Sequence, residues 1–538
     1  MNRSGTEWIR ISFLPALVVL LSAGAASGQI VPANGPAAQP AARSAAGPET
    51  PQVVAFPANG VTLEDAVRMT LAYSPNLKLA ESAMHQQRGV AQEQSGLFDP
   101  TLQMMVSFED RSEESADFQN GTFDLKLPKY FRGGLLVTPH ANTNLSSTSA
   151  DVTPSPQAAS GTTGLDLWTL TAGVEFGLPL LRNRGATAFA AGERAARTEA
   201  EASRLTHEHE ASVVALGTIQ AYWDLRAEED SLTATQRSVE VAVRLVEVAK
   251  SLVTAEELPR IELARAQAGE ARAQSSFSDA QRRVRDARVA LVTAIGVTVA
   301  DGDGALPSTK DAFPVVTPAP AFQAAAATIL ATESVGRRLD VGASQKLDEA
   351  GRILEAGAIR NKSPRLDLTA DTWMSALGAD TINRAMDRWV GPSASLGLEF
   401  EMPFGNNSLR GLAVQRSAEA RQRQVSVADL TRQVRLEVLR VAAAVSEAAA
   451  RVQQAEVAVR LYGETVDAEI ERFKVGETTL IDTLQSEQQL TDAQLTLASA
   501  QRDLAQLVAE LRYQTGTLLP GMAVAGPNLI SLPSGTGR

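Results

Sequence analysis

The stretch LTDAQLTLASAQRDLAQLVAEL, residues 490–511, carries apolar residues at alternating steps of three and four. This spacing is the a/d seam with which one helix packs along another in a coiled coil. The stretch EARAQSSFSDAQRRVRDARVAL, residues 270–291, repeats the register 220 positions earlier. The glycines that follow the two stretches, Gly516 and Gly296, are separated by the same 220 positions. A long helix that occurs twice indicates a duplicated unit.

The composition favours long helices that pack through small residues. Of the 538 residues, 44% are hydrophobic and only 5% are aromatic, which is unlike a globule built on bulky side chains. The net charge of −12 disfavours a nucleic-acid partner, because phosphate binding requires a basic surface. The chain has no cysteine, so disulfides, thiol chemistry and a lipid-bearing cysteine are excluded.

The N-terminus has the features of a secretory signal peptide, which we predict over residues 1–28. Arg3 and Arg10 precede or flank the apolar run 11–21, and small residues follow it. The alternative is an uncleaved anchor, but the apolar run is shorter than the roughly 20 residues that a spanning helix needs. Residues 29–59 are rich in Ala and Pro and are predicted to be disordered. An exported chain without disulfides fits a bacterial envelope protein.

Two repeats of the same element order account for the rest of the chain. The first repeat, 60–300, has helices, strands within 100–179 and a long helical hairpin over 186–295. A Gly- and Pro-rich linker is predicted over 301–320. The second repeat, 321–519, has helices, strands within 364–403 and a hairpin over 410–515. Residues 520–538 form a C-terminal tail.

The strand regions alternate apolar and polar residues, as in Leu102, Met104, Val106 and Phe108. Their lengths differ between the repeats: Pro100 to Pro179 spans 79 positions, whereas Pro364 to Pro403 spans 39. The first repeat therefore carries about 40 extra residues, and an added hairpin is one interpretation.

About four two-faced strands per chain cannot close a barrel, since about eight is the smallest common number. Open strand edges are not tolerated in lipid, so we expect sister chains to share the strands. Three chains would give a 12-stranded barrel, and the helical rods would continue it as a tube roughly 100 Å long. Trp168, Trp373 and Trp389 lie in or beside strands; they are candidates for an aromatic girdle at the membrane surface or for interior packing.

Several short motifs together resemble the TolC-like outer-membrane efflux family. In chain order they are VTLEDA at 61–66, FDP at 98–100, PLLR at 179–182, AYWDL at 221–225, PRLDL at 364–368, and VG at 475–476 with LID at 480–482. The resemblance covers about 61–519 and implies a mainly α fold: duplicated helical hairpins form a trimeric periplasmic α-barrel, joined to an outer-membrane β-barrel. It also implies a non-enzymatic channel that passively conducts solutes or proteins in tripartite efflux or type I secretion. The implied partners are a periplasmic adaptor, an inner-membrane pump and outer-membrane lipid.

The two hairpin turns are the predicted gate and docking surface. The family's second turn reads V-G-x-x-T-x-x-D, which Val475, Gly476, Thr479 and Asp482 match. Three copies of Asp482 would form a negative ring that favours cations; the alternative is a carboxylate that faces its own helix dipole. Glu262 occupies the position 220 residues earlier. The predicted adaptor contacts are Val475, Gly476, Glu477, Thr478, Thr479, Leu258 and Pro259.

The family's pattern is not complete at these turns. The best-known member has a second acid where this chain has Gln485, and Tyr and Arg where it has Phe473 and Thr478. We therefore expect a weaker ring and none of the links that those two side chains make. In the first turn Glu256 replaces the glycine, and Pro259 is an added proline.

The sequence contains no pattern that favours an enzyme, a metal or a cofactor. His207 and His209 are two positions apart on a helix and do not share a face, so no metal is predicted there. Nucleophile elbows, phosphate loops and dinucleotide fingerprints are absent from the sequence. The alternative to a channel is a periplasmic coiled-coil adaptor or a structural envelope protein, which would need a single hairpin flanked by small β-domains.

Overall fold

The computed structural model describes residues 54, 56–57, 59–113, 116–151, 162–299, 306–315, 324–379, 381–475 and 477–519. The predicted signal peptide, most of the segment 29–59, parts of the linker 301–320 and nearly all of the tail lie outside these residues. All the described residues belong to one compact unit.

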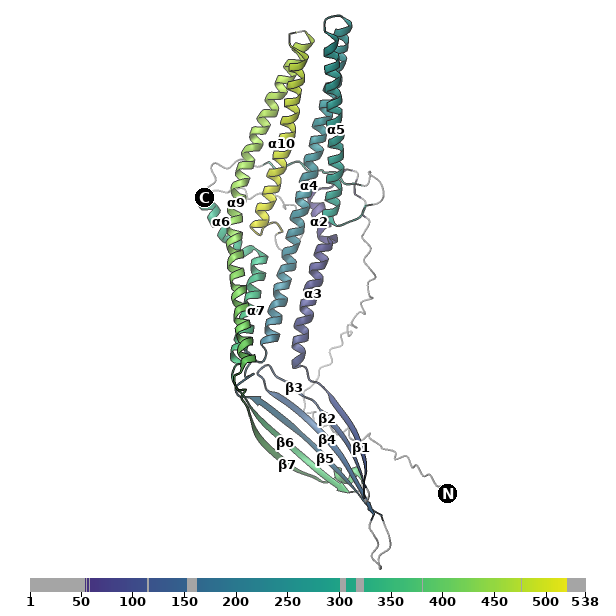
Figure 1. The fold of residues 1–538 in the computed structure, drawn as a ribbon, viewed down its shortest axis with the longest axis vertical. Helices are drawn as coiled ribbons and strands as arrows, with labels where there is room; N and C mark the ends of the chain where they lie inside the picture. Colours follow the sequence, from purple (N-terminus) through teal and green to yellow (C-terminus); the bar gives the residue numbers. More distant parts are fainter. Residues whose placement is uncertain are drawn as a thin grey trace, which may run out of the picture. The chain divides into compact units, whose positions relative to one another are not determined.

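The elements of the first repeat are α2 (Leu63–Tyr73), α3 (Pro75–Ser95), η1 (Gly96–Phe98), β1 (Gln103–Glu113), β2 (Ala116–Lys126), β3 (Lys129–Tyr130), β4 (Leu136–Asp151), β5 (Thr162–Pro179), α4 (Ala191–Thr254) and α5 (Arg260–Ile295). Those of the second are α6 (Ala324–Arg337), α7 (Leu339–Arg360), β6 (Arg365–Ala379), α8 (Ile382–Met386), β7 (Trp389–Glu401), α9 (Asn407–Lys474) and α10 (Leu480–Gln514). Both repeats run from helices to strands and then to a long helical hairpin (Figure 1).

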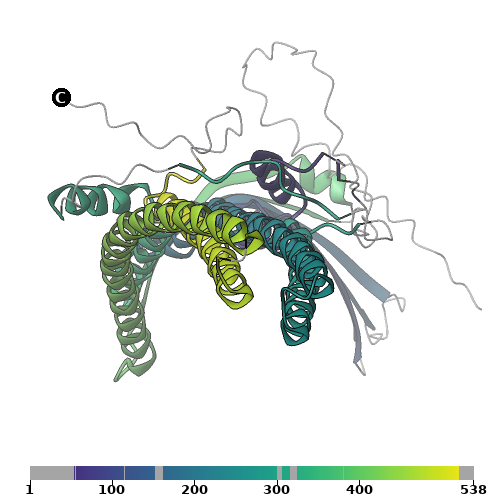
Figure 2. The same cartoon turned by 90° about the horizontal axis from the view of Figure 1, so that it is seen from above.

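Two long helices, α4 with 64 residues and α9 with 68, connect two levels of helix packing. Near the sheet, α4 packs along α3 and α7, and α7 packs along α9. Farther from the sheet, α4 packs along α5 and α10, and α10 packs along α9. Each level is therefore a row of four helices, and Figure 2 shows that the row is curved. Within the described part of the chain, every helix is too short or too polar to cross a membrane.

The predicted seam of α10 is broader in the structure. Leu504 is buried, as predicted, but Leu507 and Leu511 are only half-buried, while Ala505 and Ala509 are buried. The reason is that α10 has two neighbours, α4 and α9, so it buries a wider stripe than the a/d positions of a two-stranded coiled coil.

The main helical core forms where α4, α5 and α10 meet the short helix α2. Tyr222, Leu225, Leu291 and Ile295 are fully buried there, together with Val61. Alanines fill much of the remaining interface, which allows the helix axes to approach closely.

The order of the sheet is β1-β2-β4-β5-β6-β7, every neighbouring pair is antiparallel, and β3 pairs with β4 outside this path. The expectation of about four strands per chain is therefore wrong, since the described residues form a seven-stranded sheet. The extra length of the first repeat is the cause, because it supplies the β1–β2 hairpin. The mainly α architecture with an antiparallel sheet is confirmed.

The strand register places apolar side chains of neighbouring strands on the same face of the sheet. Met104 in β1 pairs with Leu125, Leu125 with Ala141, and Ala141 with Ala172, so these four side chains share a face. On β7, Leu396 belongs to the same face and is 76% exposed. Among the described helices, the one that covers this face is α8, which packs on β5 and β6.

Three predicted boundaries differ in the structure. Val54, within the predicted disordered segment, donates its N–H to the carbonyl oxygen of Thr298 at 2.9 Å. In the predicted linker, residues 306–315 are ordered, because Phe313 packs on the helical core and the Asp311 carboxylate accepts the N–H of Leu63 at 2.7 Å. Helix α4 begins at 191 instead of 186, after turns in which residues 188–190 bond back to 185 and 186.

Candidate functional site: the helical hairpin turns

The first hairpin turn, residues 255–259 between α4 and α5, reverses the chain through a left-handed residue. Glu256 has φ 60°, a conformation that glycine usually supplies. Its N–H bonds to the carbonyl of Val253 at 3.2 Å, and the N–H of Glu257 bonds to that of Leu252 at 3.0 Å. These two bonds define a Schellman motif. Glu256, which lies 220 positions before Gly476, therefore has the left-handed conformation that a glycine would adopt more easily.

The second turn, residues 475–479 between α9 and α10, has the corresponding bond, from the N–H of Glu477 to the carbonyl of Arg472 at 2.9 Å. Gly476 lies outside the described residues. The Thr478 hydroxyl donates to Oε2 of Glu469 at 2.7 Å, which fastens the turn to the last part of α9. Val475 is 70% exposed.

The two predicted gate carboxylates begin their helices in different ways. Thr479 caps α10: its hydroxyl oxygen accepts the N–H of Asp482 at 3.3 Å and its hydroxyl donates to Asp482 Oδ2 at 2.6 Å. Asp482 is exposed and lies near the positive end of the helix dipole. Glu262 is half-buried and pairs with Arg265 at 2.5 Å. The charge of Glu262 is therefore matched locally, whereas that of Asp482 faces solvent and its own helix terminus.

An apolar cluster joins the two hairpins close to their turns. Phe473 of α9 and Leu480 of α10, both at most 3% exposed, pack against Leu245 and Ala249 of α4 and Ala266 of α5. Leu258, a predicted adaptor contact, is half-buried against this cluster. Pro259 is exposed and is the N-cap residue of α5. The structure therefore holds the two turns together, and the sequence did not identify Leu245, Ala249, Ala266 and Leu480 as part of this site.

Glu487 lies two helical turns farther along α10 and is 7% exposed. Burial raises its pKa to about 7, although the Ser238 and Thr491 side chains and the charge of Arg244 act in the opposite direction. Among the described atoms, its Oε2 has no hydrogen-bond partner. Because Ser238 and Arg244 belong to α4, Glu487 is an ionisable group at the interface between the two hairpins. The a/d pattern did not reveal it, since it lies outside the assigned seam.

Exposed isoleucines mark both turns. Ile261 is 60% exposed and Ile481 is 48% exposed, and they are 220 positions apart in the repeat. With Val475, each turn or the helix start beside it carries an exposed apolar side chain, which is compatible with a contact surface. The 220-residue offset was the sequence signal that could have paired them, but neither was predicted as a site residue.

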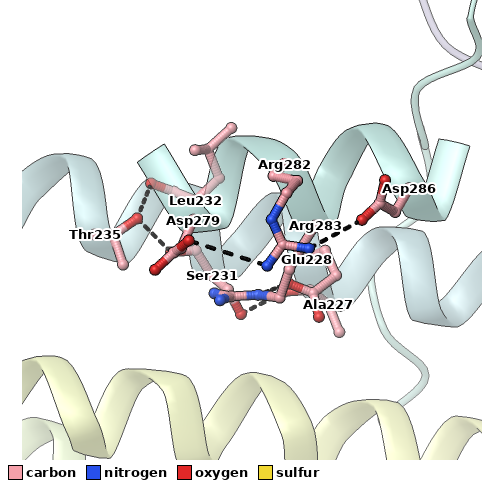
Figure 3. A network of polar contacts seen from close by, with 9 residues as sticks. All are labelled: Ala227, Glu228, Ser231, Leu232, Thr235, Asp279, Arg282, Arg283 and Asp286. Carbon is pink, nitrogen blue, oxygen red and sulfur yellow. Dashed lines mark hydrogen bonds and ion pairs between the residues drawn. The ribbon is translucent and has the colours of Figure 1, made fainter. Parts of the chain in front are cut away.

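The first hairpin is also fastened farther from its turn by a polar network (Figure 3). Arg283 of α5 donates to Glu228 of α4 at 2.9 Å. Arg282 lies between Asp279 and Asp286 on its own helix, at 4.0 and 3.4 Å. In α4, the hydroxyls of Ser231 and Thr235 bond to backbone carbonyls within the helix. Among the residues drawn, the Arg283–Glu228 pair crosses between the helices, and Arg288 of α5 adds a second such ion pair with Glu229 of α4 at 3.5 Å.

Each hairpin turn lies at the end of its helices away from the sheet (Figure 1). Several solved structures have a similar fold. CmeC, an outer-membrane channel of Campylobacter jejuni, aligns with a TM-score of 0.59 and 15% identity over 85% of this chain and 85% of its own. VceC, an outer-membrane protein of Vibrio cholerae, aligns at 0.58 and 17% over 84% and 96%. The open state of the MtrE outer-membrane channel of Neisseria gonorrhoeae aligns at 0.57 and 14% over 87% and 97%.

The chain has the TolC-like fold. No family model and no curated protein matches its sequence, so the TolC-like fold is established by structure at low sequence identity. Among the described residues, no group of three or more His, Asp or Glu side chains is placed to hold a metal ion. His209 instead lies beside Tyr513, with its Nε2 3.3 Å from the hydroxyl.

Proposed function

We propose that this chain is the outer-membrane exit duct of a tripartite export system and that it works as a homotrimer. One observation carries the proposal: the sheet has two open edges, β1 and β7, and an apolar face that the described helices leave largely uncovered. A sheet of this kind is stable in a bilayer only when its edges are paired, so sister chains supply the missing neighbours and lipid covers the apolar face.

The direction of the strands supports closure between sister chains. β1 leaves α3 and β7 leads into α9, so the two edge strands run in opposite directions. The β1 edge of one chain can therefore pair antiparallel with the β7 edge of the next. The similar solved structures include OprN, CmeC and MtrE, which are described as outer-membrane channels.

Transport through such a duct is passive and requires no chemistry of its own. The hairpin turns form the periplasmic entrance, with Asp482 as the charge that selects among ions and Glu262 as a weaker contributor. The partners are a periplasmic adaptor at the turns, through Val475, Gly476, Glu477, Thr478, Thr479, Leu258 and Pro259, and an inner-membrane pump behind it. The system is either an efflux or a type I secretion assembly.

Membrane fractionation followed by planar-bilayer recording tests this function. We expect an oligomer in the outer membrane that dissociates only on heating and conducts ions in a bilayer. A soluble periplasmic monomer would exclude the duct and support the adaptor. An adaptor is less compatible with the fold, because an adaptor is built on a single hairpin, whereas α4–α5 and α9–α10 are two.

A further inference from the structure

The chain enters and leaves the β1–β2 hairpin at neighbouring residues, Thr101 and Pro128. The N–H of Thr101 donates to the carbonyl oxygen of Pro128 at 3.2 Å, and the N–H of Leu127 donates to that of Pro139 at 2.9 Å. Residues 102–127 therefore form an excursion whose ends are in contact. Such a segment can be removed without moving the residues on either side of it.

The excursion lies within the sheet and is not a loop on its surface. β1 pairs with β2 along its length from Gln103↔Lys126 to Glu113↔Ala116, and β2 pairs with β4 from Ala116↔Ala150 to Lys126↔His140. The apolar and polar faces of the sheet also continue into the hairpin. Val106 and Phe123 share the apolar face, while Ser107 and Thr122 share the polar one. The hairpin therefore widens the wall by two strands.

The two strands of the hairpin bring the width of the sheet close to the width of the row of four helices. Strands spaced ~4.8 Å apart and tilted by ~40° each occupy ~6.3 Å of circumference. Six strands then span ~38 Å per chain, and four would span ~25 Å. Four helices in a row, at axis separations of ~9 Å, span ~36 Å. The six-stranded path β1-β2-β4-β5-β6-β7 thus has the same arc as the row of four helices, and a four-stranded one would be narrower by about a third.

We propose that the β1–β2 hairpin sets the bore of the duct in the outer membrane, by giving the wall eighteen strands in a trimer. This inference rests on the proposed channel function and deepens it. At ordinary tilt such a barrel is ~36 Å across between backbones, against ~24 Å for twelve strands, and barrels of 16–18 strands enclose an aqueous channel.

Disulfide cross-linking tests whether the hairpin is part of the wall. The chain has no cysteine, so any disulfide that forms must join the introduced cysteines. Ser107→Cys in β1 is combined in turn with Ser393→Cys, Ser395→Cys or Glu399→Cys in β7. The control uses Asn144→Cys in β4 in place of Ser107→Cys. Asn144 is level with Ser107 in the sheet, because Thr122 of β2 pairs with both residues. We expect cross-linked oligomers with Ser107 and none with Asn144. Cross-links with Asn144 alone would place the hairpin outside the wall and overturn the proposal.

A deletion tests the bore. In the variant that lacks residues 102–127, Thr101 is joined directly to Pro128. Poly(ethylene glycol) of graded size is added from the extracellular side, where it probes the sheet independently of the hairpin turns. We expect the largest polymer that enters the intact pore to be about 1.5 times as wide as the largest that enters the deletion pore. Equal cut-offs in two conducting pores would overturn the proposal. If the deletion variant does not fold, the cross-links still show whether the hairpin is part of the barrel wall. An intact chain that neither assembles nor conducts would refute the channel function itself.

Discussion

The hydroxyl of Tyr222 donates a hydrogen bond to Oδ2 of Asp311 at 3.0 Å, across 89 positions of sequence. It also lies 3.0 Å from the carbonyl oxygen of Val61, and it accepts the N–H groups of Lys310 and Asp311 at 3.2 and 3.1 Å. One buried side chain of α4 therefore ties the start of α2 to the segment that connects the repeats. The neighbouring Trp223 stacks on Phe313 of the same segment, with ring centres 5.4 Å apart.

Replacing Tyr222 by Phe should destabilise the fold by about 1–3 kcal/mol, because the Asp311 N–H loses its acceptor and the Asp311 carboxylate loses a donor, whereas the Lys310 N–H and the Val61 carbonyl keep their bond to each other. Denaturant unfolding of the purified protein measures the loss. Tyr462→Phe is the matched control, since Tyr462 is 37% exposed, and it should unfold like the wild type. Equal stability of both variants would show that the hydroxyl of Tyr222 contributes nothing.

Stability should depend on pH through Glu487. Its pKa is raised from 4.5 to about 7 in the folded chain, so between these values the folded state binds more protons than the unfolded state. Stability therefore falls as pH rises from about 4.5 through 7, and the full penalty is present above pH 7. Glu487→Gln should remove it, with a gain on the order of 3 kcal/mol at pH 8 and none at pH 4.

Thermal unfolding at several pH values measures this difference. Glu471→Gln is the control, because the Glu471 side chain is 73% exposed and pairs with Lys474; it should leave the pH profile unchanged. A Glu487→Gln variant with the same pH profile as the wild type would mean that Glu487 is hydrated in solution.

Asp482→Asn should lower the cation preference of the pore, because the exposed carboxylate is removed while the Thr479 cap of the helix remains. Reversal potentials in a salt gradient measure the preference. Glu262→Gln should have a smaller effect, since Arg265 already balances that charge. If the two variants change selectivity equally, or neither changes it, the assignment of Asp482 as the selecting charge fails.

Leu480→Ala should loosen the contact between the two hairpins. The side chain is 1% exposed within the cluster that contains Leu245 and Phe473, and such truncations cost about 2–5 kcal/mol. We expect faster proteolysis at the turns and a larger mean conductance. Unchanged proteolysis would show that other contacts hold the turns.

Ile261→Glu combined with Ile481→Glu should weaken binding of the partner at the turns without loss of stability, because both side chains are exposed. Pull-down of a periplasmic partner from cross-linked cells measures binding, and thermal unfolding serves as the control. Undiminished capture by the double variant would place the docking surface elsewhere.

The sequence predicted the helices well where the repeat could be read twice. The hairpin predicted over 186–295 ends at Ile295 in the structure, and Gly296 and Gly516 end helices in left-handed conformations, with φ 82° and 69°. The tight approach of these glycines to neighbouring backbone, such as Gly516 to the Arg337 carbonyl, leaves no room for a side chain. The glycines in the sequence therefore predicted where these helices end.

Other features depend on which elements become neighbours, and periodicity does not contain that information. The buried position of Glu487 follows from α10 packing on α4 as well as on α9. Residues 306–315 have a linker composition, yet Asp311 and Phe313 find partners on α2 and α4. The difference in length between the strand regions indicated an added hairpin, but only the pairing of β2 with β4 shows that it belongs to the sheet.

The uninterrupted course of α4 and α9 has a mechanical consequence. Their companions change from α3 to α5 and from α7 to α10 partway along, yet neither long helix is broken at that level. The chain thus has two helices that run unbroken through both levels of packing, and each is joined to the sheet by a connection, 180–190 before α4 and 402–406 before α9. A force applied at a turn would therefore be carried along the whole length of α4 or α9 to the connection at the sheet.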